Sequence, residues 1–322
     1  MNRMLLRAIF GVIAVASAVA LAGCGGGGSS SVTTHSTGPH QLQTTRVDGL
    51  VTVHSFSYRS FDGSRVPALL AVPRGLTTRA CLIWQYGLGS NKEQSASVWQ
   101  GAAGLGLATF SIDFRDHGQR GSLQVLARAT QNPYSIAEIV RGSVGDLRRG
   151  IDYLEAQPYC HKTIAYAGIS LGGVIGTILT ATDPRIKAAV IMSTPSTWRS
   201  LVPSGIILSQ LEHKPAQLAA ALKVLAPLDP DRYIGRIPAG RLLILSGRQD
   251  SVVPLASALA LQAAARNPKT VIDYTGGHDP TSGTAAASNE QAIGSFLLTH
   301  IVEPSYGVSA AGLGTYSQMA VN

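Results

Sequence analysis

A serine, an aspartate and a histidine each stand shortly after an apolar run, and together they are the residue types that nucleophilic catalysis uses. The serine, Ser170, lies in the segment Gly-Ile-Ser-Leu-Gly-Gly at 168–173, between the apolar runs 164–167 and 174–182. The glycines allow a strand and a helix to approach closely, so the segment predicts a strand, a sharp turn and a helix with the serine hydroxyl exposed on the turn. Such a serine is a candidate nucleophile.

A serine hydroxyl alone is a weak nucleophile at neutral pH and needs a general base, which a third residue orients. His278 is the predicted base, because the glycine pair at 276–277 can turn the chain back after the apolar run 270–274. Asp250, which follows the apolar run 242–245, is the predicted acid that holds one histidine tautomer. The chain order of serine, aspartate and histidine is the one expected for a single fold.

Other ionisable residues offer alternatives to this triad. His117 lies in a loop at a strand end and is a second candidate base, although we expect it to pack and hydrogen-bond near the floor of the site. Asp273 lies inside a strand, and Asp279 is too near the predicted base in sequence to sit behind its ring. Asp113 and Asp116 are expected to serve the architecture of their loop.

A tetrahedral intermediate needs two hydrogen-bond donors, normally backbone amides fixed before the reaction begins. The amide of Leu171, directly after the serine, is the first predicted donor. The second should come from the turn after the apolar run 80–84, where Leu88 is the favoured residue and Tyr86 the alternative.

Strands and helices alternate through most of the chain, and this alternation positions the candidate residues. It predicts an α/β fold with a mostly parallel central sheet flanked by helices and with ligands at the carboxyl ends of the strands. Expected strands are 51–59, 66–72, 80–84, 107–113, 164–167, 188–192, 242–245 and 270–274, and expected helices are 91–105, 143–157, 174–182, 257–265 and 285–300. The segment 195–237 is an insertion that is expected to cap the pocket and set the acyl and alcohol preference.

Six segments in the same order resemble the α/β-hydrolase superfamily, especially its dienelactone-hydrolase-like and prolyl-oligopeptidase-like serine esterase branch. The resemblance implies the α/β-hydrolase fold and the same triad and oxyanion loop. In two respects the chain departs from its relatives: many of them have His-Gly where this chain has Tyr-Gly at 86–87, and dienelactone hydrolases proper use a cysteine nucleophile. The matching segments are Ser-Phe-Asp-Gly at 60–63, Tyr-Gly-Leu-Gly at 86–89, Asp-Phe-Arg-Asp-His-Gly at 113–118, the serine turn, the Asp250 segment and Gly-Gly-His at 276–278.

The N-terminal segment reads as an export signal. Arg3 and Arg7 precede the uncharged run 8–22, and Leu-Ala-Gly-Cys at 21–24 resembles a bacterial lipobox, in which the cysteine becomes acylated. We therefore expect a lipoprotein signal peptide over 1–23 and an acylated Cys24 that anchors the chain outside the cytoplasm, on a bacterial cell membrane or outer membrane. The apolar run is shorter than a membrane span.

The domain boundaries follow from composition. A flexible Gly/Ser/Thr tether is expected over 24–45, the hydrolase domain over 46–303 and a C-terminal tail over 304–322.

The formal net charge of +8 comes from scattered basic residues, so no nucleic-acid partner is expected. No metal site and no organic cofactor is implied.

Two cysteines of the expected domain lie at the starts of neighbouring strands. After export, Cys81 and Cys160 would meet an oxidising compartment. Because they lie at the starts of neighbouring strands, a disulfide between them is geometrically possible. The alternative is a buried free thiol at Cys81.

These observations predict a serine hydrolase that cleaves carboxylic esters, with a small-molecule or lipid-like ester as substrate and an acyl-enzyme intermediate. A serine peptidase of the prolyl-oligopeptidase type and a thioesterase use the same residues and remain alternatives. From a different class, a non-catalytic binding protein on a hydrolase scaffold remains a third. The sequence leaves the acyl-chain length and the oligomeric state open.

Overall fold

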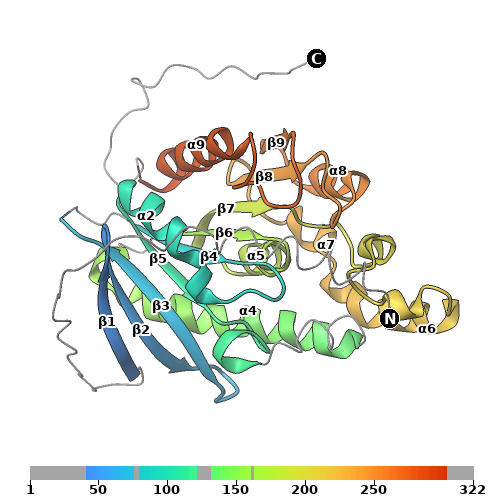
Figure 1. The fold of residues 1–322 in the computed structure, drawn as a ribbon, viewed down its shortest axis with the longest axis horizontal. Coiled ribbons are helices and arrows are strands. Elements are labelled where there is room, and N and C mark those ends of the chain that lie inside the picture. Colours follow the sequence, from blue (N-terminus) through green and yellow to red (C-terminus); the bar gives the residue numbers. More distant parts are fainter. Residues whose placement is uncertain (1–40, 76–79, 122–131, 161–162, 303–322) are drawn as a thin grey trace, which may run out of the picture. The chain divides into compact units, whose positions relative to one another are not determined.

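The computed structural model describes residues 41–75, 80–121, 132–160 and 163–302, and its centre is a nine-stranded sheet (Figure 1). The predicted signal peptide, Cys24 and the tail 304–322 lie outside these ranges. Within the described ranges, no helix combines the length and the apolar character that crossing a bilayer requires. The strands are β1 (Gln41–Asp48), β2 (Val51–Arg59), β3 (Arg65–Pro73), β4 (Ala80–Gln85), β5 (Leu107–Ile112), β6 (Ile164–Ile169), β7 (Ile186–Met192), β8 (Leu242–Gly247) and β9 (Thr270–Tyr274).

The strand order places the predicted site residues at one edge of the sheet. The order is β1-β2-β3-β5-β4-β6-β7-β8-β9, in which β1, β2, β3 and β5 pair antiparallel and all pairs from β5 through β4 to β9 are parallel. The carboxyl ends of β4, β6, β7, β8 and β9 therefore share one edge, as the sequence predicts for a mostly parallel α/β sheet. The fold class is confirmed.

Helices cover both faces of this sheet (Figure 1). Alternate residues of β6 point to opposite faces: Ile164 and Tyr166 pack with α4 and α5, whereas Ala165 and Ala167 pack on the side of α2 and α9. The α-helices are α2 (Ala96–Gly104), α4 (Pro133–Glu155), α5 (Leu171–Thr182), α6 (Pro215–Leu225), α7 (Asp231–Ile234), α8 (Leu255–Ala264) and α9 (Ala286–Leu297). The short helices are η2 (Lys92–Ser95), η3 (Gly118–Arg120), η4 (Pro158–Cys160), η5 (Arg199–Ser204), η6 (Ser209–Leu211), η7 (Ala226–Leu228) and η8 (Leu298–Val302).

One predicted boundary is wrong. The tether was expected to reach residue 45, but β1 begins at Gln41 and pairs antiparallel with β2. An edge strand is held by backbone hydrogen bonds to one neighbour and needs no buried face, and Val47 of β1 is well exposed. This strand therefore lacks the hydrophobic alternation that reveals a strand in sequence.

Helix α4 begins ten residues earlier than expected, at Pro133 instead of 143. Asn132 caps it, because the Asn132 Oδ1 accepts a hydrogen bond from the Tyr134 amide at 2.9 Å, and Pro133 occupies the first position, where its missing N–H costs nothing. The interior glycine Gly142 weakens the helical pattern in sequence. A Cβ there would lie 2.0 Å from the Arg115 Nε, so the glycine admits an arginine against the helix.

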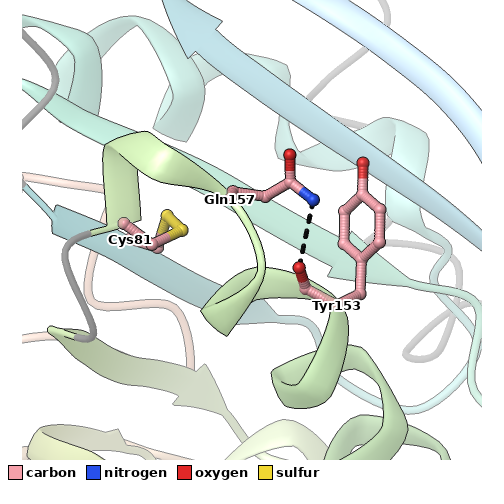
Figure 2. The surroundings of a disulfide bond; sticks show 4 residues. Cys81, Tyr153 and Gln157 are labelled. Atoms are coloured by element: carbon pink, nitrogen blue, oxygen red, sulfur yellow. Dashed lines mark hydrogen bonds between the residues drawn. A yellow bond between two sulfur atoms is a disulfide. The ribbon is translucent and has the colours of Figure 1, made fainter.

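A disulfide joins Cys81 at the start of β4 to Cys160 in η4, with 5.0 Å between the Cα atoms. Figure 2 shows it beside the end of α4, where the Gln157 Nε2 donates to the Tyr153 carbonyl at 3.1 Å. Both sulfur-bearing residues are fully buried. The bond ties the start of the strand before the predicted oxyanion turn to the segment that leads into β6.

Candidate active site

Ser170 occupies a strained turn between β6 and α5. Its φ of 57° and ψ of −116° lie outside the conformations that non-glycine residues prefer, and such strain is concentrated at functional sites. The neighbouring glycines are required for close approach: a Cβ at Gly172 would lie 2.6 Å from the Gln85 carbonyl oxygen, and one at Gly168 would lie 2.7 Å from the backbone of Gly172. A Cβ at Gly87 would lie 3.3 Å from that of Ser170, so the turn after β4 passes directly over the serine.

His278 and Asp250 are brought together from two different strand ends. The His278 Nδ1 lies 2.8 Å from the Asp250 Oδ2, and the exposed fraction of the side chain is 2% for the aspartate and 15% for the histidine. The other carboxylate oxygen accepts hydrogen bonds from the amides of Val252 and Val253 at 2.8 and 2.9 Å. A carboxylate held this firmly can keep the Nδ1 proton on the imidazole and leave Nε2 free to accept one.

A chain of hydrogen bonds runs from the serine turn to the histidine loop. The Ser170 amide donates to the Met192 carbonyl at 2.9 Å, and the next residue, Ser193, has its hydroxyl 3.3 Å from that of Tyr274. The Tyr274 hydroxyl donates to the Gly277 carbonyl at 2.7 Å, one residue before His278. Burial raises the pKa of Tyr274 to about 12, so this phenol keeps its donor proton at any working pH.

Ser193 itself is strained. Its φ of 46° is a second left-handed non-glycine conformation at the same sheet edge, directly after β7. The Ser193 amide donates to the Leu245 carbonyl at 2.9 Å and thereby joins the end of β7 to β8. Backbone hydrogen bonds therefore connect the ends of β6, β7 and β8, and the Ser193–Tyr274 side-chain contact connects β7 to β9.

The two predicted oxyanion donors lie on either side of Ser170. Leu171 is the first residue of α5, so its amide belongs to the helix N-terminus, where amides lack intrahelical partners and favour negative charge. Leu88 lines the same cavity as Ser170. Tyr86 is buried, and its hydroxyl is engaged below the turn: it donates to the Ile112 carbonyl and accepts from the Phe114 amide, both at 3.0 Å.

His117 contacts the turn after β4 that carries the predicted oxyanion donor, whereas the predicted base His278 pairs with Asp250. The Gly89 amide donates to the His117 Nε2 at 3.1 Å, and the His117 Nδ1 lies 2.8 Å from the Arg115 carbonyl oxygen, which requires the proton on Nδ1. Burial lowers the pKa of this histidine and favours the neutral ring that these contacts need. His117 is thus buried and hydrogen-bonded to the turn after β4.

Buried charges hold the loops beneath this turn, and sequence reasoning missed most of them. The Lys92 Nζ lies 2.8 Å from the Asp113 Oδ2, and both side chains are almost fully buried. Asp146 on α4 is fully buried and pairs with Arg115 at 3.0 Å and with Arg120. Asp113 serves its loop as expected. No local sequence motif reveals the roles of Lys92 and Asp146, because their ion-pair partners are distant in sequence.

A small cavity of about 40 Å³ opens beside Ser170. Its described lining is apolar apart from the serine, and it comes from the oxyanion turn, α4, α5, the Asp250 loop and the segment after β7. Sequence reasoning missed the contribution of α4 because it placed the start of that helix too late. The lining residues are Leu88, Ile136, Ile139, Ser170, Leu171, Val174, Pro195, Trp198, Leu201, Ile206, Ile207, Val252 and Val253.

The described residues contain no group of three or more histidine, cysteine, aspartate or glutamate side chains placed to hold a metal ion. The polar groups at this edge of the sheet are instead the Ser170 hydroxyl, which lines the cavity, the His278 imidazole paired with Asp250, and backbone amides. Such a set can activate a hydroxyl, receive its proton and bind an oxyanion.

One family match covers part of the chain. Residues 147–223 match the family described as "BAAT / Acyl-CoA thioester hydrolase C terminal", a range that includes Ser170 but neither Asp250 nor His278. No curated protein matches the chain.

Solved structures resemble the described fold over most of its length. A cold-adapted esterase from an Arctic intertidal metagenomic library aligns with a TM-score of 0.59 and 20% identity, over 80% of this chain and 97% of that one. An acetyl xylan esterase from Paenibacillus sp. R4 aligns with a TM-score of 0.67 and 19% identity, over 81% and 89%. The Pyrococcus furiosus esterase Pf2001 aligns with a TM-score of 0.59 and 16% identity, over 77% and 91%. At such identities the likeness shows the fold, which is the α/β-hydrolase fold.

Proposed function

We propose that this chain is a serine hydrolase that cleaves carboxylic esters through an acyl-enzyme intermediate. The observation that carries the proposal is the His278–Asp250 pair at 2.8 Å, joined through Tyr274 and Ser193 to the strained turn that bears Ser170. A histidine oriented by a carboxylate at the same sheet edge as a strained serine is the arrangement that activates a hydroxyl.

The reaction proceeds in two halves. The Ser170 Oγ attacks the ester carbonyl carbon while the His278 Nε2 takes its proton, and the resulting oxyanion accepts hydrogen bonds from the amides of Leu171 and of Leu88, or alternatively Tyr86. Collapse expels the alcohol, which receives the proton from the imidazolium, and leaves an acyl ester on the serine. Water then attacks this ester with the same base, and a carboxylic acid leaves.

The cavity favours a small, uncharged acyl group. One water molecule needs at least about 10–15 Å³ of such space, so a cavity of about 40 Å³ is small and favours a short acyl group. Its lining offers no charged side chain among the described residues. Two of the solved structures that share the fold are acetyl xylan esterases, and an acetyl ester is a substrate of matching size.

A thioesterase is the second candidate, because the matched family is described as an acyl-CoA thioester hydrolase. The same triad cleaves both bond types. The two activities are separated by comparing kcat/KM for p-nitrophenyl acetate with that for acetyl-CoA, and a higher value for the thioester would make thioesterase the leading function.

The test uses the full chain in detergent, with p-nitrophenyl acetate, butyrate and octanoate as substrates. We expect turnover of the short esters, and we expect Ser170→Ala to reduce kcat at least about 1000-fold. Ser288→Ala, a change of an exposed serine on α9, is the matched control and should leave kcat unchanged. Wild-type chain that neither turns over any ester nor reacts with a fluorophosphonate would make the binding-protein alternative the leading one.

The proposal extends to location. A signal peptide over 1–23 and acylation of Cys24 would hold the hydrolase outside the cytoplasm on a bacterial membrane, and this part rests on sequence alone. In expressing cells, wild-type chain should incorporate a labelled palmitate analogue and sediment with membranes, whereas Cys24→Ala should do neither. Equal labelling of the two chains would exclude Cys24 as the anchor.

A further inference from the structure

A second cavity, which opens to solvent at the exposed residues Arg199, Ala219 and Lys223, lies in the cap insertion and shares one lining residue with the catalytic cavity beside Ser170. It measures about 240 Å³, against about 40 Å³ for the cavity beside Ser170. Among the described residues, Trp198 is the one that lines both. The remaining lining residues of the second cavity come from η5, α6, η7 and the residue after it, and they are Arg199, Ala219, Leu222, Lys223, Ala226 and Asp229.

Trp198 is held in place at two points. Its backbone amide donates to the Asp229 Oδ1 at 2.8 Å, and its indole Nε1 donates to the Leu228 carbonyl at 3.1 Å. Only 5% of the residue is exposed although it borders two cavities, so its remaining surface is packed. A buried indole with a satisfied N–H is costly to displace, so the Trp198 side chain is held in place.

The second cavity suits the end of an acyl chain. The side chains of Ala219, Leu222 and Ala226 give it an apolar part, while the charged side chains belong to Arg199, Lys223 and Asp229. An acyl chain that passed the position of the indole would thus exchange water for apolar contacts. Each buried methylene improves binding about fourfold.

We propose that Trp198 sets the acyl-chain length of the substrate by separating the catalytic cavity from the cap cavity. This inference rests on the proposed ester hydrolysis. With tryptophan at position 198, the acyl group ends at the indole and short acyl esters are preferred. A smaller side chain at 198 joins the two cavities and admits acyl chains of eight or so carbons.

The decisive measurement is the ratio of kcat/KM for p-nitrophenyl octanoate to that for p-nitrophenyl acetate, in the full chain. We expect Trp198→Ala to raise this ratio by about 10- to 100-fold. If thermal unfolding shows that Trp198→Ala is poorly folded, Trp198→Leu replaces it in the test. Leucine preserves more apolar packing and should raise the octanoate-to-acetate ratio by a smaller factor. An unchanged ratio in a folded variant that still cleaves acetate would overturn the inference and leave the proposed function standing.

A second change made in the cap cavity distinguishes joined cavities from general loosening. Ala219 lines only the cap cavity, so Ala219→Phe should leave the ratio of the wild-type chain unchanged. Combined with Trp198→Ala, the phenylalanine should refill the space and remove the gain for octanoate. A gain that survives in the double variant would mean that the longer chain does not enter the cap cavity.

A binding measurement covers the case in which no ester is cleaved. On Ser170→Ala chain, the affinity for 1-octanol relative to 1-butanol, measured by calorimetry, should rise with Trp198→Ala and fall again with the added Ala219→Phe. If this affinity pattern appears but the wild-type chain cleaves no ester, Trp198→Ala joins the cavities and the proposed function is wrong. If neither ratio nor affinity responds, Trp198 does not separate the two cavities.

Discussion

Two regions meet at the cavity beside Ser170, the strand-end loops and the cap, and they are held by different forces. On the strand-end side, directional bonds fix each part: Asp250 orients His278, Tyr274 holds Gly277, and His117 holds Gly89. On the cap side, the wall consists mainly of apolar side chains such as those of Leu201, Ile206 and Ile207. Directional bonds define positions within a fraction of an ångström, whereas apolar contacts fill volume and tolerate exchange. Changes on the strand-end side should therefore alter kcat, and changes in the cap should alter substrate size and stability.

The largest expected effect comes from Asp250→Asn. The amide can still contact the imidazole, but it no longer favours the tautomer with the proton on Nδ1, so we expect kcat to fall by about 10⁴-fold with KM little changed. Asp273→Asn is the control, since that carboxylate on β9 accepts from the Gln262 Nε2 at 2.7 Å and makes no contact with the imidazole. Similar losses in both variants would mean that Asp250 has a structural role only.

His117→Phe tests the support of the oxyanion turn. The new ring can still pack against Tyr86 and Phe114, whose ring centroids lie 6.0 and 5.9 Å away, but it cannot accept the Gly89 amide. Full loss of one oxyanion donor costs about 100- to 1000-fold. A loosened turn should cost less, about 10- to 100-fold in kcat.

The control for this histidine is His300→Phe on η8, where the imidazole stacks on Phe296 and contacts its carbonyl, remote from the turn. This variant should keep its kcat. A loss greater than about 10⁴-fold in His117→Phe would instead favour His117 as the base, which is the alternative that the sequence left open.

Tyr274→Phe removes the bond that positions the loop before His278. Because Asp250 still orients the imidazole, we expect kcat to fall only about 10-fold and KM to hold. Tyr233→Phe is matched to it, since the Tyr233 hydroxyl donates to the Pro227 carbonyl at 2.8 Å in the cap. If both variants show wild-type kcat, Tyr274 does not position the histidine.

The strand-end side was also the more predictable of the two regions. Ser170, Asp250 and His278 follow strands and stand among glycines, so local patterns reveal both their placement and their chemistry. The cap wall depends on how 195–237 folds back over α4, and no local pattern encodes that contact. The same reason hides the Lys92–Asp113 pair, whose members meet only once two strand-end loops are assembled.

The chain elements that sequence reasoning placed poorly have particular physical causes. Strand β1 is an exposed edge strand without a buried face, and the start of α4 is obscured by Gly142, which exists to admit Arg115. That arginine pairs with Asp146, also on α4. The contact that requires this glycine involves a distant segment, so it cannot be recognised in the local sequence. There the glycine only indicates a helix breaker. As a consequence, Ile136 and Ile139 were absent from the predicted site although they line it.

The smallest effect is expected from Asp229→Asn in the cap, and it should appear in stability. Burial raises the pKa of Asp229 to about 6, while an unfolded chain releases this proton near pH 4. Between these values the folded state binds more protons, so the contribution of Asp229 to stability is present below about pH 4 and is lost as the pH rises through about 6.

Asparagine at position 229 keeps the acceptor for the Trp198 amide and does not ionise. The Tm of Asp229→Asn should therefore match that of the wild type at pH 4 and exceed it at pH 7.5, by a few degrees or less because the group is half-buried. A difference in Tm that is the same at both pH values would mean that ionisation of Asp229 does not destabilise the cap.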